Sequence, residues 1–456
     1  MNSPHGIARV TTATSFGFAL VQLDVTIVNV ALPRIAAQLQ AGVDRLQWVV
    51  DGYALVFAAL LLSMGYLGDR IGARKVFLAG MALFALASLA CGLAPGIGWL
   101  VAGRALQGLG AATMLPSSLA LLNHATAHAP AVRARAIGWW TAAGAIAIAA
   151  GPILGGLLLG LGGWRSIFLV NLPVCAVGVA LAWALPETIR KPAPDGFDLA
   201  GQVLAVAMLG ALIGAVIEAR PLGLSSPWVI GGFALALAAG GGFLHVERRS
   251  PHPMLPLHFF RLPGFSSAVG YGIAVNLAYY GLVFLLSLYL QTVLHYSPVR
   301  TGLAYLPLTA TFFLINIVSG WWVGRAGARQ PMTVGALVAA AAFIPLLWVD
   351  AGSSYWRMLP AFALLPLGMG LGVPAMTHTV LSAVDKAWSG VASAVLNAAR
   401  QAAGAMGVAL FGALAGNRAQ GIVGGLHAST GISMVLLLAA AALGHWGVGR
   451  SAGRSG

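Results

Sequence analysis

Two charged side chains lie inside long apolar stretches of the sequence, where charge is unusual. Asp24 falls near the middle of residues 12–32, and Arg104 falls within residues 98–122. A carboxylate in a membrane interior is costly unless it is protonated, paired or hydrated, and a guanidinium there also needs polar partners. Asp24 therefore suits a group that takes up and releases a proton. The alternative is a structural polar contact between helices.

The composition indicates a polytopic membrane protein. Hydrophobic residues make up 59% of the chain and charged residues 8%, whereas a soluble domain carries about 25% charge. The 25 basic and 11 acidic residues give a net charge of +14. Because the basic residues are spread thinly over the loops, we expect a lipid bilayer and no nucleic acid as partner. Cys91 and Cys175 lie in apolar runs, so we expect no metal centre and no cofactor.

Windows of about 20 apolar residues predict fourteen membrane-spanning helices. The expected fold class is all-α, because bare strand edges cannot be satisfied in lipid and the runs do not alternate as in a β-barrel. With the N-terminus inside, sixteen basic residues fall in cytoplasmic segments and seven in outer loops, so we expect both termini in the cytoplasm. The windows are 12–32, 46–67, 76–94, 98–122, 136–160, 166–185, 199–218, 227–246, 266–293, 301–323, 332–349, 356–382, 389–415 and 430–448.

A weak internal repeat divides these spans into two halves. Residues 65–75 form a charged, glycine-rich turn, and residues 320–330 match it with an offset of 255. Spans 1–6 thereby correspond to spans 9–14, and repeated six-helix halves are typical of transporters with a substrate site between them. Spans 7 and 8 are then an insertion. The predicted units are an N-terminal six-helix bundle (1–190), two inserted helices with linkers (191–262) and a C-terminal six-helix bundle (263–456).

Several segments resemble motifs of the major facilitator superfamily, and in particular of its fourteen-span drug:proton antiporter family. The resemblance covers nearly the whole chain, and the motifs occur in order on the expected spans. Two positions depart from the pattern: Ala73 stands where a basic residue is common, and Ala147 replaces a motif glycine. The similar segments are 23–33, 65–75, 100–112, 138 with 151–156, 164–173 and 289–298.

The resemblance implies a role in proton coupling for Asp24 and Arg104. Arg104 enters its span about 9 Å from the outer end, at ~1.5 Å per residue, and the family motif implies that it biases a nearby acid. A snorkelling cation or a hydrogen-bonding hub within the bundle is the alternative. Thr26 and Asn29 are close enough along the helix to Asp24 to line the same polar cavity.

A predicted kink in the fifth span resembles the family's antiporter motif. Proline removes a hydrogen bond inside a helix, and glycines let a neighbouring helix approach closely. The kink is either a tightly packed bend or a surface that opens and closes between the halves and seals the cavity against proton leak. Its residues are Gly151, Pro152, Gly155 and Gly156.

The charged turn after the second span has a mechanical interpretation. Asp69 stands where it can meet a helix end or an arginine of the adjacent bundle. Such a contact would act as a latch that must break when the transporter changes state. The alternative is that these charges only set the topology. The proposed latch comprises Gly65, Asp69, Arg70, Gly72 and Arg74.

Candidate substrate contacts are aromatic and weakly polar residues on central spans, because aromatic rings bind flat apolar or cationic molecules. Most of them suit ordinary packing or interfacial belts equally well. Spans 9–14 carry no acid, since Asp350 and Asp385 fall in loops, which favours neutral or monocationic substrates over dications. The candidates are Asn29, Trp139, Trp140, Asn276, Tyr279, Tyr280, Phe284, Tyr289, Gln291, Phe312, Phe313, Asn316 and Arg400.

The favoured function is a secondary transporter that exports amphiphilic drugs in exchange for protons. A dedicated exporter of one metabolite, such as an antibiotic or siderophore, would have the same motifs, and a lipid translocase or structural membrane protein is a third reading. An enzyme is not expected, because no catalytic triad or metal-spaced cluster occurs, and ATP drive lacks a phosphate-binding loop. We expect a monomer in the bacterial inner membrane.

Overall fold

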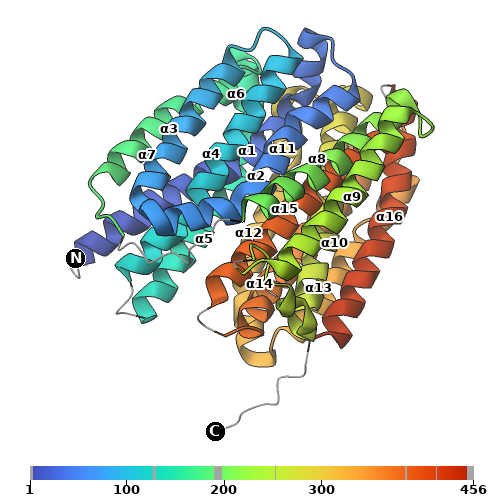
Figure 1. Cartoon of the computed structure of the whole chain (residues 1–456). Helices are drawn as coiled ribbons and strands as arrows, with labels where there is room; N and C mark the ends of the chain where they lie inside the picture. Colours follow the sequence, from blue (N-terminus) through green and yellow to red (C-terminus); the bar gives the residue numbers. More distant parts are fainter. Residues whose placement is uncertain are drawn as a thin grey trace.

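The computed structural model describes residues 4–126, 130–188, 198–251, 253–385, 388–416 and 418–448. Within these ranges the protein is built from helices and contains no strand (Figure 1). The elements are α1 (Pro4–Leu39), α2 (Val43–Ile71), α3 (Ala73–Gly92), α4 (Ile97–Ala125), α5 (Pro130–Gly162), α6 (Ser166–Leu169), α7 (Asn171–Trp183), α8 (Leu199–Leu222), α9 (Pro227–Arg249), η1 (Leu257–Arg261), α10 (Pro263–Leu288), η2 (Tyr289–Val293), α11 (Pro298–Ala304), α12 (Leu306–Ala326), α13 (Arg329–Ala341), η3 (Ile344–Trp348), α14 (Tyr355–Ser382), α15 (Ser389–Leu414) and α16 (Ala419–Trp446).

The described residues contain eleven helical segments long and apolar enough to cross a membrane, or twelve if the bent helix α5 counts as one span. The all-helical membrane class is therefore confirmed, whereas the predicted number of fourteen is not. Helices α12 and α15 lie outside this set. Four predicted single spans are each built from two pieces: α6 with α7, α10 with the π-helical turn η2, α11 with α12, and α13 with the 3₁₀ turn η3.

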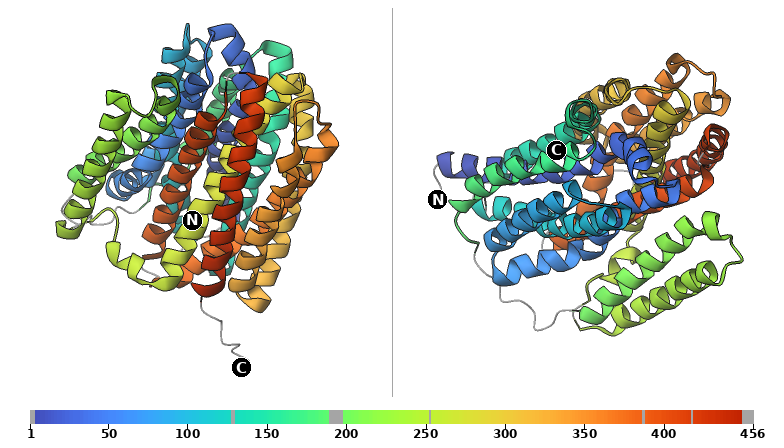
Figure 2. Two further views of the ribbon diagram at one scale, coloured as in Figure 1. Left: turned by 90° about the vertical axis from the view of Figure 1, so that its right-hand side faces the viewer. Right: turned by 90° about the horizontal axis from the view of Figure 1, so that it is seen from above.

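The helices form two bundles with a helix pair beside them (Figures 1 and 2). Helices α1–α7 pack mainly on one another, as do α10 and α12–α16, whereas the short helix α11 packs mainly on α5. The bundles meet through α2 with α15 and through α5 with α11 and α12. Helices α8 and α9 pack on each other, and α8 also packs on α2 and α15. The predicted boundary at residues 190/191 lies outside the described residues.

Two glycines mark the internal repeat in the backbone. Gly72 separates α2 from α3 with φ +110°, and Gly327 separates α12 from α13 with φ +74°. Glycine adopts such left-handed conformations without steric cost, so each turn can be sharp. The two positions differ by the same 255 residues that relate the two charged turns in the sequence.

The bundles are joined toward the end of the molecule where α2 begins, which we call the Val43 end. Gln47 of α2 donates to the carbonyls of Val408 at 3.1 Å and Ala409 at 2.6 Å in α15. Gln291 of η2 donates to the carbonyl of Val30 in α1 at 2.8 Å. These hydrogen bonds link the two bundles directly.

Candidate functional site

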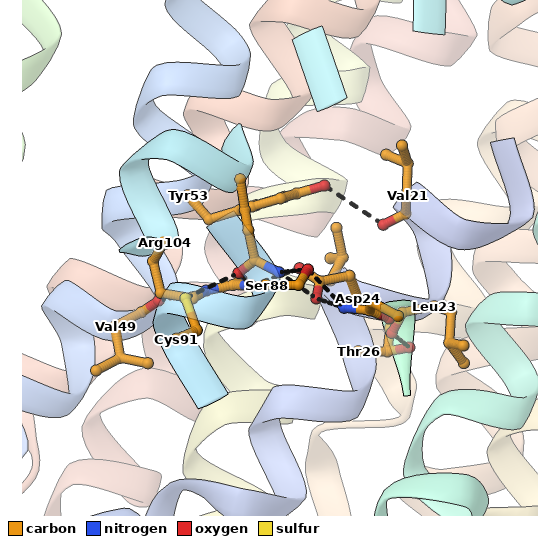
Figure 3. Close-up of polar contacts among 12 residues, drawn as sticks. Val21, Leu23, Asp24, Thr26, Val49, Tyr53, Ser88, Cys91 and Arg104 are labelled. Atoms are coloured by element: carbon orange, nitrogen blue, oxygen red, sulfur yellow. Dashed lines mark hydrogen bonds and ion pairs between the residues drawn. The ribbon is translucent and has the colours of Figure 1, made fainter. Parts of the chain in front are cut away.

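Asp24 and Arg104, which lie 80 residues apart in the sequence, form a buried ion pair. Nη1 of Arg104 donates to Oδ2 of Asp24 (Figure 3). Asp24 is 0% exposed and Arg104 is 1% exposed. Nε of Arg104 donates to the carbonyl of Val49 at 3.0 Å, and its guanidinium lies 4.4 Å from the ring centroid of Tyr53. The pair is therefore desolvated. Helix α4 supplies the cation, which also contacts α2, and α1 supplies the anion.

Three polar side chains complete the network around Asp24. Asn171 of α7 donates to Oδ1 of Asp24 at 3.1 Å, and Gln107 of α4 donates to the same oxygen at 3.3 Å. Gln107 also donates to the hydroxyl of Ser88 in α3 at 2.7 Å. Asp24 of α1 thus accepts from two helices, α4 and α7, while Ser88 of α3 accepts from Gln107 and Asn171, and these bonds limit the cost of burying the charge. The sequence analysis did not assign these residues to the site, although isolated polar residues in apolar spans are a usable signal.

A cavity of about 20 Å³ lies beside the ion pair, between the two bundles. Asn29 and Arg104 face it from the first bundle, and Tyr280 and Gln401 face it from the second. Its volume suits about one water molecule. Arg400, the neighbour of Gln401, is partly buried, and its Nε has no hydrogen-bond partner among the described residues. This is the place where both halves reach the candidate proton site.

The remaining substrate candidates are not gathered at this cavity. Trp140 stacks on Phe18 at a centroid distance of 3.8 Å, and Asn276 bonds the carbonyl of Gly272 in its own helix at 2.8 Å. Tyr289 is buried and donates to the carbonyl of Asp350 at 2.5 Å, and Gln291 joins the bundles as described above. These contacts are structural ones. The side chains of Phe313 and Asn316 lie outside the described residues.

Trp139 lies on a larger groove at the opposite end from Val43. The groove has a volume of about 960 Å³ and is formed by the start of α1, the end of α4 and the first half of α5. Trp139 is 68% exposed, and Arg135 and Phe16 also line the groove. A volume of this size fits a drug-sized molecule.

Helix α5 bends at the predicted kink. The segments Arg135–Ile148 and Ala150–Gly162 meet at 42°. A Cβ atom at Gly155 would meet the carbonyl of Ile27 in α1 at 2.9 Å, and one at Gly156 would meet the carbonyl of Pro298, the first residue of α11, at 2.6 Å. A Cβ at Gly151 would clash with Oγ1 of Thr26 in α1, and a Cβ at Gly302 of α11 would clash with the carbonyl of Pro152. The glycines therefore let α5 touch both bundles at once.

The contacts of Gly65, Gly72 and Arg74 in the charged turn lie within the first bundle. The backbone amide of Arg74 donates to the Glu187 carboxylate at 2.9 Å, and its guanidinium donates to the carbonyl of Leu185 at 2.7 Å. A carboxylate at the start of α3 is favoured by the exposed amides and the helix dipole. A Cβ at Gly72 would meet the Glu187 carboxylate at 2.6 Å, and one at Gly65 would lie 3.5 Å from Pro116. A partner for Asp69 in the other bundle stays a prediction.

A two-bundle helical membrane protein with a buried ion pair at the contact of its halves has the architecture of a membrane transporter. The sequence matches the Major Facilitator Superfamily over residues 14–408. The chain therefore belongs to this family, which comprises transporters and not enzymes.

The relatives are bacterial drug and antibiotic efflux transporters. The Methylenomycin A resistance protein of Streptomyces coelicolor is 38% identical over 401 residues, which covers 88% of this chain and 84% of the relative. Multidrug resistance protein Stp of Mycobacterium tuberculosis is 39% identical over 402 residues, with coverage of 88% and 74%. The crystal structure of a POT family transporter in complex with 5-aminolevulinic acid shares the fold, with a TM-score of 0.72 at 13% identity over 96% of each chain.

Proposed function

We propose that the protein exports hydrophobic or monocationic drug-like molecules in exchange for protons by alternating access. The observation that carries this proposal is the buried Asp24–Arg104 pair beside a cavity that both bundles line. Protonation of Asp24 removes the charge that holds Arg104, so the network has two arrangements of different charge. A ligand or proton that favours one arrangement shifts the population of states.

The two bundles supply the moving parts. We infer that they rock about the central cavity, that the present state is closed toward the Val43 end, and that the α5 kink and the charged turn at residues 65–75 are the surfaces that change. We further infer that α12 and α15 complete a set of fourteen spans, with α8 and α9 as the inserted pair. The protein then works as a monomer in the bacterial inner membrane with both termini in the cytoplasm.

The substrate class follows from the distribution of acids. Asp350 and Asp385 lie in loops of the second bundle, so its helices offer a cation aromatic faces such as Tyr280 but no counter-charge. Asn29 and Gln401 offer uncharged polar contacts at the cavity. A molecule with one positive charge or none is therefore accommodated with less desolvation penalty than a dication.

The test is uncoupler-sensitive efflux of a dye panel from cells that express the protein. Asp24→Asn keeps the size of the side chain and removes its negative charge, and we expect it to abolish proton-driven efflux. Asp350→Asn, in an exposed loop, is the matched control and should retain it. Full proton-driven efflux by Asp24→Asn at normal expression contradicts the proposed coupling.

A dedicated exporter of one antibiotic is the second candidate, because one relative carries the name of a single antibiotic. The same dye panel separates the two. Efflux of several unrelated dyes supports a multidrug exporter, whereas efflux of none, together with resistance to a single antibiotic, supports the dedicated exporter.

A further inference from the structure

Asp51 is a second buried acid of the first bundle, separate from the Asp24 network. It lies in α2 about 12 Å from the helix start, at ~1.5 Å per residue, and it is 0% exposed. Neither of its carboxyl oxygens has a hydrogen-bond partner among the described residues. Native proteins rarely leave a buried carboxyl in this condition, so it calls for a physical account.

The residues one turn before Asp51 show which way its side chain faces. Gln47 donates to backbone carbonyls of α15, and Nε1 of Trp48 donates to Glu218 of α8 at 3.3 Å. Residues three and four positions apart share one face of a helix. Asp51 is therefore directed at the junction of α8 and α15.

The residues one turn after Asp51 face the same junction. Ala54 and Leu55 pack against a buried apolar cluster in which α8 and α15 each contribute two residues. The cluster consists of Ile213, Ile217, Ala405 and Ala409. We call this junction of α2, α8 and α15 the Asp51 seam.

The charged groups on the surrounding elements are engaged elsewhere or lie on other faces. Glu218 accepts from Trp48, Arg220 of α8 donates to the carbonyl of Ala413 at 3.1 Å, and Arg104 of α4 is held by Asp24. Asp44 and Arg45, at the start of α2, pair with each other at 3.4 Å. Arg400 of α15 faces α10, where a Cβ at Gly272 would lie 3.4 Å from Cγ of Arg400. No ion pair between Asp51 and any of these groups occurs in the described part of the chain.

An ionised carboxylate in this seam would be a buried charge without a partner, the most costly arrangement available to it. The neutral acid lacks that cost. We propose that Asp51 is a proton-binding residue whose protonation allows α8 and α15 to close on α2. The seam then holds a neutral acid when it is shut and a carboxylate when water enters it.

The device makes closure of the Val43 end depend on proton uptake. When α15 leaves α2, the carboxylate is hydrated, and it takes one proton from water at that face before the seam closes again. Asp24 is paired with Arg104, whereas neither carboxyl oxygen of Asp51 has a hydrogen-bond partner among the described residues, so the two acids lie in different electrostatic surroundings in one conformation. This inference rests on the proposed proton-driven export, but the charge state of Asp51 is measurable without transport.

The first measurement is infrared spectroscopy of the purified full-length protein in lipid nanodiscs at neutral pH. A protonated carboxylic acid gives its own carbonyl band, which we expect in the wild type and expect to be lost in Asp51→Asn. Asp44→Asn, on the same helix in an exposed ion pair, is the matched control and keeps the band. A band unchanged in Asp51→Asn overturns the proposal.

The second measurement uses proteoliposomes loaded with ethidium, a monocationic dye. With a pH gradient, we expect Asp51→Asn to lose at least tenfold of the gradient-driven flux while downhill equilibration stays within twofold of the wild type. Asp51→Leu, which removes the unpartnered oxygens, is a second variant and should unfold at the same or a higher temperature. Wild-type gradient-driven flux in both variants overturns the inference. Absence of such flux in the wild type would instead refute the proposed function, and the infrared band would still decide the charge state of Asp51.

Discussion

The two bundles are related by a sequence repeat but differ in the charged side chains that they bury. The first buries an acid and an arginine in one network, in which Asn171 and Gln107 complete the shell of the acid. In the described part of the second bundle, the buried polar groups of α16 are hydroxyls, those of Ser429, Thr430 and Ser433. The acids of that bundle lie in loops. Among the described residues of the two bundles, the buried acids are thus concentrated in one half, whereas the residues with which the other half lines the central cavity are uncharged.

Arg104→Ala is expected to have the largest effect, because it tests the charge network of the first bundle directly. It leaves Asp24 buried without its cation, so we expect a loss of about 3–5 kcal/mol of stability and at least a hundredfold loss of proton-driven transport. Thermal unfolding in detergent and flux in proteoliposomes measure the two effects. The double variant with Asp24→Asn should be more stable than Arg104→Ala alone, because the uncompensated anion is gone. Equal stability of the two variants would show that the pair is not coupled.

Asn171→Ala weakens the same shell without breaking the ion pair. A hydrogen bond to a charged group contributes about 1.5–3 kcal/mol, and we expect a loss of stability in this range. The matched control in the second bundle is Asn276→Ala, whose amide bonds an uncharged carbonyl of its own helix and should cost about 1 kcal/mol. Calorimetry of both variants measures the two losses of stability. Equal losses would mean that the network around Asp24 carries no charge.

Gln401→Glu tests whether the lack of an acid in the second bundle limits the charge of the substrate, because it places an acid at the central cavity. We expect efflux of dicationic dyes to rise about tenfold relative to monocationic dyes, equivalent to about 1.4 kcal/mol of discrimination. The readout is the ratio of the two fluxes in one vesicle preparation. An unchanged ratio would mean that the substrate does not approach Gln401.

The smallest effect is expected at the exposed ion pair of the second bundle. Arg357 and Asp350 lie 3.9 Å apart with exposed side chains, and exposed pairs contribute about 0–1 kcal/mol. Arg357→Ala should therefore shift the unfolding temperature and the flux only marginally. A loss similar to that of Arg104→Ala would mean that charge in the second half is as important as in the first.

The class of protein could be predicted from the sequence because its cause is compositional. A chain with so little charge and so many apolar windows has to form membrane helices. The spacing of 255 residues between two charged turns predicts a duplication, and Gly72 and Gly327, both with positive φ, have the same spacing. Asp24 and Arg104 could be singled out because charge inside an apolar window is conspicuous. The number of spans was less secure, because pieces such as α11 and α12 divide an apolar run.

Which side chains contact one another was decided only by the tertiary structure. Asp24 meets Arg104 across 80 residues and Asn171 across 147 residues, and no periodicity along one helix records which faces of four helices will meet. The structure also places Tyr280 at the central cavity, whereas Tyr289 donates to the carbonyl of Asp350 in a loop. It also placed Asp51 in the buried junction of α2, α8 and α15, whereas the sequence showed only an acid near one end of a span. Burial is a property of neighbours, and the neighbours of a membrane helix come from distant parts of the chain.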